Sequence, residues 1–143
     1  MQKKFIDYGL GFPVTLLNVT MVKVRGQWTP QIPYNRLEER VLLSLSRQEC
    51  RWTGQQVKFI RQHFGMTLQA FAKQLGVSHV AALKWEKAAS SPAAMSWALE
   101  KDLRLFVQSK LSKDPKRLAA LYEELTAHPV SKGCESVPVE IAV

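Results

Sequence analysis

Cysteine is scarce in this chain of 143 residues, which contains only Cys50 and Cys134. The two lie far apart in sequence, and there is no Cys-x-x-Cys pair. Neither a disulfide-rich secreted fold nor a four-ligand zinc site is therefore expected. The simplest interpretation is a cytoplasmic protein with two free thiols and no bound metal.

Long apolar runs are missing as well. Mostly apolar stretches such as residues 41–45, which include Ser44, are far shorter than the roughly 20 residues that a helix needs to cross a bilayer. The first residues lack the apolar stretch and the small-residue cleavage site of a secretory signal. We therefore expect no membrane association and a cytoplasmic location.

The sequence also lacks the residue sets that carry catalysis. No paired carboxylates and no Ser/His/Asp set stand out, and Gly9-Leu10-Gly11 lacks the third glycine of a phosphate-binding loop. The histidines, at positions 63, 79 and 128, are not at metal-ligand spacing. The sequence therefore predicts a protein that is not an enzyme and needs no cofactor.

Positive charge, in contrast, is in excess, with a net charge of +8. Residues 1–46 have a net charge of +3 and residues 47–87 of +5, whereas residues 88–143 are neutral. A basic surface attracts nucleic acid or an anionic membrane without distinguishing between them. Charge alone therefore does not identify the partner.

Composition and periodicity divide the chain into four regions. They are an N-terminal β-ribbon plus helix (1–46), a domain of short helices (47–111), a C-terminal helix (112–128) and a flexible tail (129–143). The sequence thus predicts a mainly α-helical fold. The first region is a candidate partner-binding unit, and residues 137–143 are an alternative strand within the tail.

The first region holds two β-type patterns. Residues 14–19 and 21–25 are rich in β-branched side chains and are predicted to be two short strands. Residues 35–46 are predicted to form a helix, because the apolar side chains in this segment would share one face of it. A β-ribbon is only marginally stable alone, so it must pack on another element.

The pattern of residues 53–87 predicts three consecutive helices, each with a capping residue at its start. Thr53 caps the first, and Gly65 ends it. The second follows Thr67 and ends at Gly76, and the third follows Ser78. Between the last two helices, a tight turn predicts a steep crossing, as in a helix-turn-helix whose second helix enters the DNA major groove.

The third helix has two distinct faces at about 100° per residue. Ala82 and Trp85 point towards the core. The opposite face carries a hydrogen-bonding ring, apolar side chains and a cation, namely His79, Val80, Leu83 and Lys84. These groups suit base edges, thymine methyl groups and guanine or phosphate. The alternative is an ordinary solvated helix face.

Residues 53–86 resemble the Cro/phage-repressor (XRE) family of helix-turn-helix proteins. The resemblance rests on the motifs Ile60-Arg61, Gly65-Met66-Thr67, Phe71-Ala72, Leu75-Gly76-Val77-Ser78 and Trp85-Glu86. It implies an XRE-like, or lambda-repressor-like, five-helix domain that binds double-stranded DNA. The chain departs from the family at two positions. Leu68 stands where the family usually has glutamine, and Ala88 stands where it usually has glycine.

The resemblance and the helix faces together assign the site. The residues expected to contact DNA are Thr67, Lys73, Ser78, His79, Val80, Leu83, Lys84 and Lys87. By the resemblance, His79, Val80 and Lys84 touch bases, and Arg61 and Glu86 form a structural ion pair. Lys73 and Lys87 are expected to lie near phosphates.

The order of regions is also similar to antitoxins of the MqsA type. That resemblance implies a toxin protein as a further partner of the N-terminal region. Such antitoxins commonly hold zinc through paired cysteines, and this chain lacks those cysteines. A zinc site is therefore not expected here.

We accordingly expect a sequence-specific transcriptional regulator, a repressor that acts as a homodimer and doubles as an antitoxin. The apolar faces of residues 96–111 and 115–125 are the candidate dimer interface, unless they only close the monomer core. The rival hypothesis is a protein-interaction adaptor that keeps the helix-turn-helix as a scaffold, and a small enzyme comes third. Among the tryptophans, Trp28 in a basic, exposed stretch is the candidate base-stacking residue.

Overall fold

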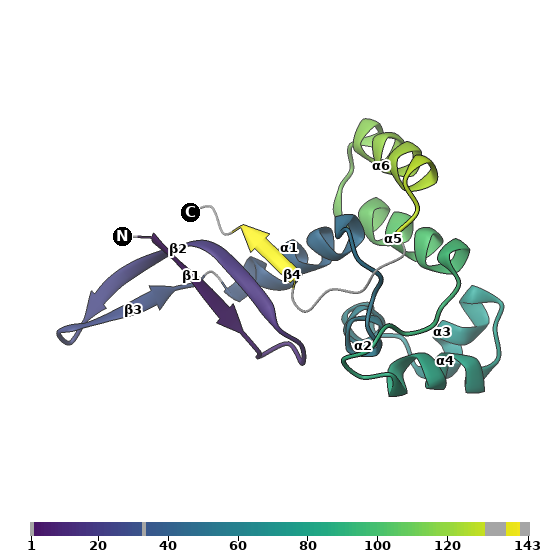
Figure 1. Cartoon of the computed structure of the whole chain (residues 1–143), viewed down its shortest axis with the longest axis horizontal. Helices are drawn as coiled ribbons and strands as arrows, with labels where there is room; N and C mark the ends of the chain where they lie inside the picture. Colours follow the sequence, from purple (N-terminus) through teal and green to yellow (C-terminus); the bar gives the residue numbers. More distant parts are fainter. Residues whose placement is uncertain (1, 33, 131–136, 141–143) are drawn as a thin grey trace.

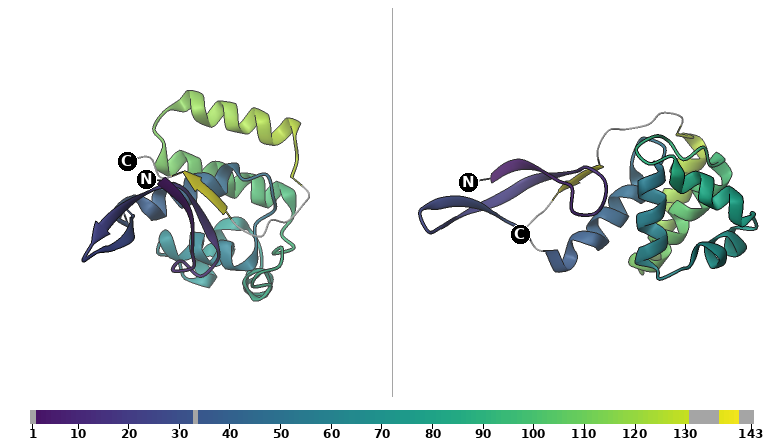
Figure 2. Two further views of the ribbon diagram at one scale, coloured as in Figure 1. Left: turned by 60° about the vertical axis from the view of Figure 1, so that its left-hand side comes forward. Right: turned by 90° about the horizontal axis from the view of Figure 1, so that it is seen from below.

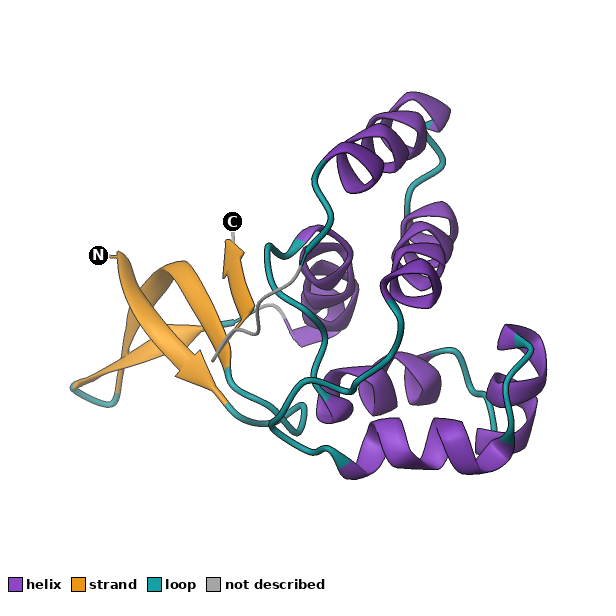
Figure 3. Ribbon diagram, turned by 45° about the vertical axis from the view of Figure 1, so that its right-hand side comes forward, coloured by secondary structure: helices purple, strands orange, loops and turns teal. Residues whose placement is uncertain are grey.

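The computed structural model describes residues 2–32, 34–130 and 137–140. Within them the fold is mainly helical, with a small sheet at one end (Figures 1 and 3). The elements are β1 (Gln2–Asp7), β2 (Val14–Val24), β3 (Gln27–Gln31), α1 (Tyr34–Arg47), α2 (Gly54–His63), α3 (Leu68–Leu75), α4 (His79–Lys87), α5 (Trp97–Leu111), α6 (Pro115–Ala127) and β4 (Val137–Glu140).

β2 is the central strand of the sheet. It pairs antiparallel with β1 and β3 and parallel with β4. The two strands predicted at 14–19 and 21–25 are therefore one strand, which corrects the prediction. Asn18 has a φ of 56° at the point where the register with β1 shifts, so it forms a bulge rather than an end. The bulge resets the alternation, and Val14, Leu16 and Val19 are all buried.

The sequence prediction missed β1 and β3 as separate strands. β4 lies inside the predicted flexible tail, so that description is wrong for Val137–Glu140, where the alternative of a strand is correct. Residues 131–136 and 141–143 of the tail lie outside the described residues. β1 is short and pairs with the next strand along the chain, whereas β4 is stabilised by pairing with a segment distant in sequence.

α1 connects the sheet to the helices, as Figure 2 shows. Its Val41, Leu42 and Leu45 are fully buried in one core that also includes sheet residues such as Leu16 and α2 residues such as Ile60. Phe12 and Phe59 meet edge to face with ring centroids 5.3 Å apart. The apolar core thus continues across position 46, the predicted boundary between the first region and the domain of short helices.

Local capping signals place the helices of the middle region. The Thr53 hydroxyl and the Gln56 side chain form a complete capping box at α2. The range 47–111 contains four helices, so a fifth is counted only if α6 is included. α6 buries Leu121 and Leu125, but Tyr122, in the segment 115–125 whose apolar face was predicted, is 52% exposed.

Two further expectations concern the cysteines and the membrane. Cys50 is disulfide-bonded, so the prediction of free thiols is wrong for this residue. Distance in sequence does not measure distance in space, which is why spacing could not exclude a bond. Cys134 lies outside the described residues, and the cytoplasmic location stays a prediction that has lost this support. No helix among the described residues is long and apolar enough to cross a bilayer.

Candidate nucleic-acid interface

α3 and α4 are joined by three residues, Gly76, Val77 and Ser78. Gly76 has a φ of 70°, a left-handed conformation that glycine adopts without strain. The amide of Val77 donates to the carbonyl of Ala72 at 3.0 Å, which closes the turn. The Ser78 hydroxyl accepts from the amide of Ala81 at 3.1 Å, so α4 begins with a satisfied cap.

The two faces of α4 divide as the sequence predicts. Ala82 and Trp85 are buried against the core. On the other side His79, Val80 and Lys84 are exposed, and Val80 keeps 58% of its surface. Leu83 differs from its neighbours because it is half-buried, which leaves it a smaller contact surface than expected.

The remaining residues of the predicted site are also exposed. Thr67 caps α3 by accepting from the amide of Ala70 at 3.1 Å. Lys73 lies in the last turn of α3, and Lys87 in the last turn of α4. The α3–α4 unit therefore presents its cations, caps and α4 side chains to solvent.

The charged side chains in the part of the sequence that contains this unit are almost all basic. Between positions 50 and 99 the only acidic residue is Glu86. Glu86 accepts two hydrogen bonds from Arg61, from Nε at 2.7 Å and from Nη2 at 3.0 Å. This is the ion pair expected from the sequence, and it leaves Lys73, Lys84 and Lys87 without a competing carboxylate in this stretch.

Arg61 also fixes where α4 lies. Its Nη1 donates to the carbonyl of Met66 at 2.9 Å, in the connection between α2 and α3. One guanidinium therefore ties α2 to α4 through Glu86 and to the start of α3 through Met66. Because the fork of a guanidinium is planar and rigid, such a bidentate contact sets orientation as well as distance.

Gly54 was not identified from the sequence, although it lets α2 reach the backbone of α4. A Cβ on Gly54 would lie 2.4 Å from the carbonyl oxygen of Trp85 and 2.7 Å from the amide nitrogen of Ala89. The first amides of α2 instead donate to carbonyls beyond α4, from Gly54 to Ser91 at 3.2 Å and from Gln55 to Ala89 at 3.0 Å. This close approach is tertiary, so no local pattern signals it.

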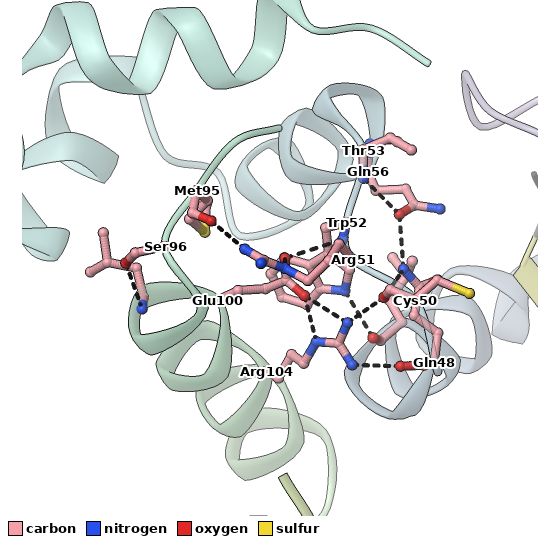
Figure 4. A network of polar contacts seen from close by, with 12 residues as sticks. Gln48, Cys50, Arg51, Trp52, Thr53, Gln56, Met95, Ser96, Glu100 and Arg104 are labelled. Carbon is pink, nitrogen blue, oxygen red and sulfur yellow. Dashed lines mark hydrogen bonds and ion pairs between the residues drawn. The ribbon is translucent and has the colours of Figure 1, made fainter. Parts of the chain in front are cut away.

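A buried polar network lies between α5 and the connector from α1 to α2 (Figure 4). Glu100 of α5 accepts from Arg51 Nε at 2.8 Å, from the Trp52 amide at 3.1 Å and from Arg104 Nη2 at 2.6 Å. Arg104 also donates to the carbonyls of Gln48 and Cys50. Arg51 donates in turn to the carbonyl of Met95. The network thus joins α5 to the connector between α1 and α2.

Burial is the main influence on Arg104. Loss of hydration lowers the pKa of the Arg104 guanidinium below its ordinary value, and the charge and hydrogen bonds of Glu100 act in the opposite direction. Arg104 and Glu100 are 0% and 1% exposed, so Arg104 depends on Glu100 for its counter-charge, while Glu100 also pairs with Arg51. Their i, i+4 spacing was the one signal in the sequence that could have indicated the pair.

The chain's own side chains are the only guide to its chemistry. Within the described residues, no group of three or more His, Cys, Asp or Glu side chains is placed to hold a metal ion. Comparison of the chain with protein-family models, curated proteins and solved structures gave no match.

Proposed function

We propose that this protein is a sequence-specific, double-stranded DNA-binding transcriptional regulator whose reader is α4. The observation that carries the proposal is the exposed face of α4. The side chains of His79, Val80 and Lys84 are exposed on α4. Arg61 binds Glu86 of this helix, and Gly54 packs against its backbone. A rigid helix that offers a ring, an apolar side chain and a cation matches the chemistry of the major groove.

In the proposed complex, α4 lies in the major groove. His79 and Lys84 hydrogen-bond to base edges, and Val80 contacts a thymine methyl group, with a minor contribution from half-buried Leu83. Lys73 and Lys87 neutralise phosphates. The N-termini of α3 and α4, capped by Thr67 and Ser78, lie near phosphates, where remaining amides favour anions.

A homodimer is part of this proposal. α5 and α6 enclose an open groove of about 600 Å³. In Figure 1, α6 lies on the side of α5 away from α3 and α4. Leu105, Phe106 and Tyr122 line it, and Asp102 and Glu123 lie beside them. Lys101 and Lys110 sit over the Tyr122 and Phe106 rings. Because both charge signs are present, a second copy related by a two-fold axis could pair them.

The finer roles follow from the resemblances described above. Binding by a dimer over a promoter would make the protein a repressor, and the order of its regions suggests an antitoxin with a toxin protein as partner. The cytoplasm is the compartment that these roles require. A protein-interaction adaptor is the second candidate, but an adaptor has no need for three cations around an exposed helix without a free carboxylate.

The phosphate contacts give a first test. Replacing Lys73 or Lys87 by alanine should weaken binding to all duplexes alike, because phosphate contacts carry no sequence information. Each replacement should reduce the slope of log K against log salt by about one. Lys116→Ala, an exposed lysine on α6, is the matched control and should leave the slope unchanged. Wild-type slopes in both Lys73→Ala and Lys87→Ala would exclude the proposed phosphate contacts.

A further inference from the structure

The turn between β2 and β3 has an unusual residue at its apex. Val24 pairs with Gln27, so Arg25 and Gly26 form a two-residue turn. Both have positive φ, 51° and 80°, which is the backbone of a type I′ turn. Such turns favour Asn-Gly, because a side chain like that of arginine is disfavoured in the left-handed conformation. Stability therefore does not explain the cation at this position.

Residues 23–29, here called the hairpin tip, are all exposed. Lys23 pairs with Trp28 across the strands, and directly opposite residues share a face of the sheet. Trp28 keeps 56% and Val24 51% of their surface. Neither Lys23 nor Arg25 has an ion pair among the described residues, and no acidic residue occurs between positions 8 and 37.

The hairpin tip lies far from the proposed reading helix. In Figure 1 and in the right-hand view of Figure 2, β2 and β3 reach away from the helices, at the opposite end of the molecule from α3 and α4. A partner bound at the tip is therefore not the half-site bound by α4. Because the ribbon projects freely, it can approach a partner without any change in the core.

We propose that the hairpin tip is a second DNA contact, which binds duplex DNA outside the half-site read by α4. The inference rests on the proposed function. Lys23 and Arg25 would neutralise phosphates, and the Trp28 ring would pack against deoxyribose or a base step. A two-stranded ribbon has the width that DNA grooves admit. Two cations, one ring and no acid fit DNA better than a lipid surface, which requires a larger apolar face.

The test compares the full-length protein with a Lys23→Gln/Arg25→Gln/Trp28→Thr variant. The control, Lys4→Gln/Tyr8→Thr, removes an exposed cation and an exposed ring from the region of β1. Thermal unfolding first establishes that both variants are folded. Affinity is then measured over a range of KCl concentrations on a short duplex with the selected site alone and on a long duplex with flanking DNA.

We expect equal affinities on the short duplex. On the long duplex the tip variant should bind about tenfold more weakly, equivalent to about 1.4 kcal/mol. Its slope of log K against log salt should be smaller by about two, since two phosphate contacts are lost. The control should behave as wild type. If the tip instead binds a separate duplex, wild type but not the variant should bridge two labelled duplexes, which also supports a DNA contact.

Other outcomes overturn the inference. Wild-type affinity, slope and bridging in the tip variant would exclude a DNA contact at the tip. Loss of binding to phosphatidylserine-containing vesicles with unchanged DNA binding would assign the tip to a membrane surface instead. If the wild type binds no duplex at all, the proposed function itself is wrong. If the wild type and the tip variant bind DNA equally well, only the further inference is wrong.

Discussion

Replacing Glu100 by glutamine should lower the free energy of unfolding by about 3–5 kcal/mol, the cost of breaking a buried ion pair. The substitution keeps the size of the side chain and removes only its charge. Arg104, which is 0% exposed, would then keep its carbonyl acceptors but lose its counter-charge. Arg51 and the Trp52 amide would lose an anionic acceptor as well. Urea unfolding gives the free energy directly.

The matched control is Glu39→Gln, which makes the same change of charge at an exposed position of α1. It should change stability by no more than about 0.5 kcal/mol. If Glu100→Gln does not fold, the Glu100→Gln/Arg104→Met double variant should recover part of the loss, because it removes the orphaned charge. Equal stabilities for Glu100→Gln and Glu39→Gln would show that the network contributes little.

The second large effect is expected at Arg61 and Glu86. Their side chains are 14% and 9% exposed, so alanine at either position should cost somewhat less than the roughly 3–5 kcal/mol of a fully buried pair. Each single variant leaves a partly buried charge without its partner, and the double variant does not. The double variant should therefore be more stable than the sum of the two losses predicts, with a coupling of about 0.5–3 kcal/mol.

Arg61→Lys is the control for geometry. Lysine keeps the charge but cannot donate two parallel hydrogen bonds to Glu86 while reaching the Met66 carbonyl. It should therefore restore only part of the stability that Arg61→Ala loses. Strictly additive single losses would mean that the pair, although formed at 2.7 Å, does not couple α2 to α4.

The helices from α2 to α4 could be predicted because their limits are local. Thr53, Thr67 and Ser78 each cap the helix that follows them, and Gly65 and Gly76 have the positive φ that ends a helix. Such signals depend on side chains within three residues of the helix end. The exposed face of α4 followed from the same periodicity, since Ala82 and Trp85 had to be buried.

The sheet and the supports of α4 could not be predicted, because they depend on distant contacts. β4 is a strand only because it pairs with β2, more than one hundred positions away in sequence. The predicted break at position 20 is absent, and the irregularity of β2 is a bulge at Asn18, where the register with β1 shifts. Gly54 is required by the backbone of α4, more than thirty positions away in sequence. Local sequence patterns do not indicate which residues far apart in sequence will be in contact.

The most direct measurement of the central claim is selection of binding sites from random duplex DNA. It should be carried out with the wild type, His79→Ala and Lys84→Ala, and with Lys58→Ala as an exposed basic control on α2. The wild type and the control should enrich one roughly palindromic sequence, with half-sites about one helical turn apart. His79→Ala and Lys84→Ala should each lose about 1–3 kcal/mol on that sequence and relax the preference at one position per half-site. If no sequence is enriched, or if both variants enrich the wild-type sites with undiminished affinity, α4 does not read DNA.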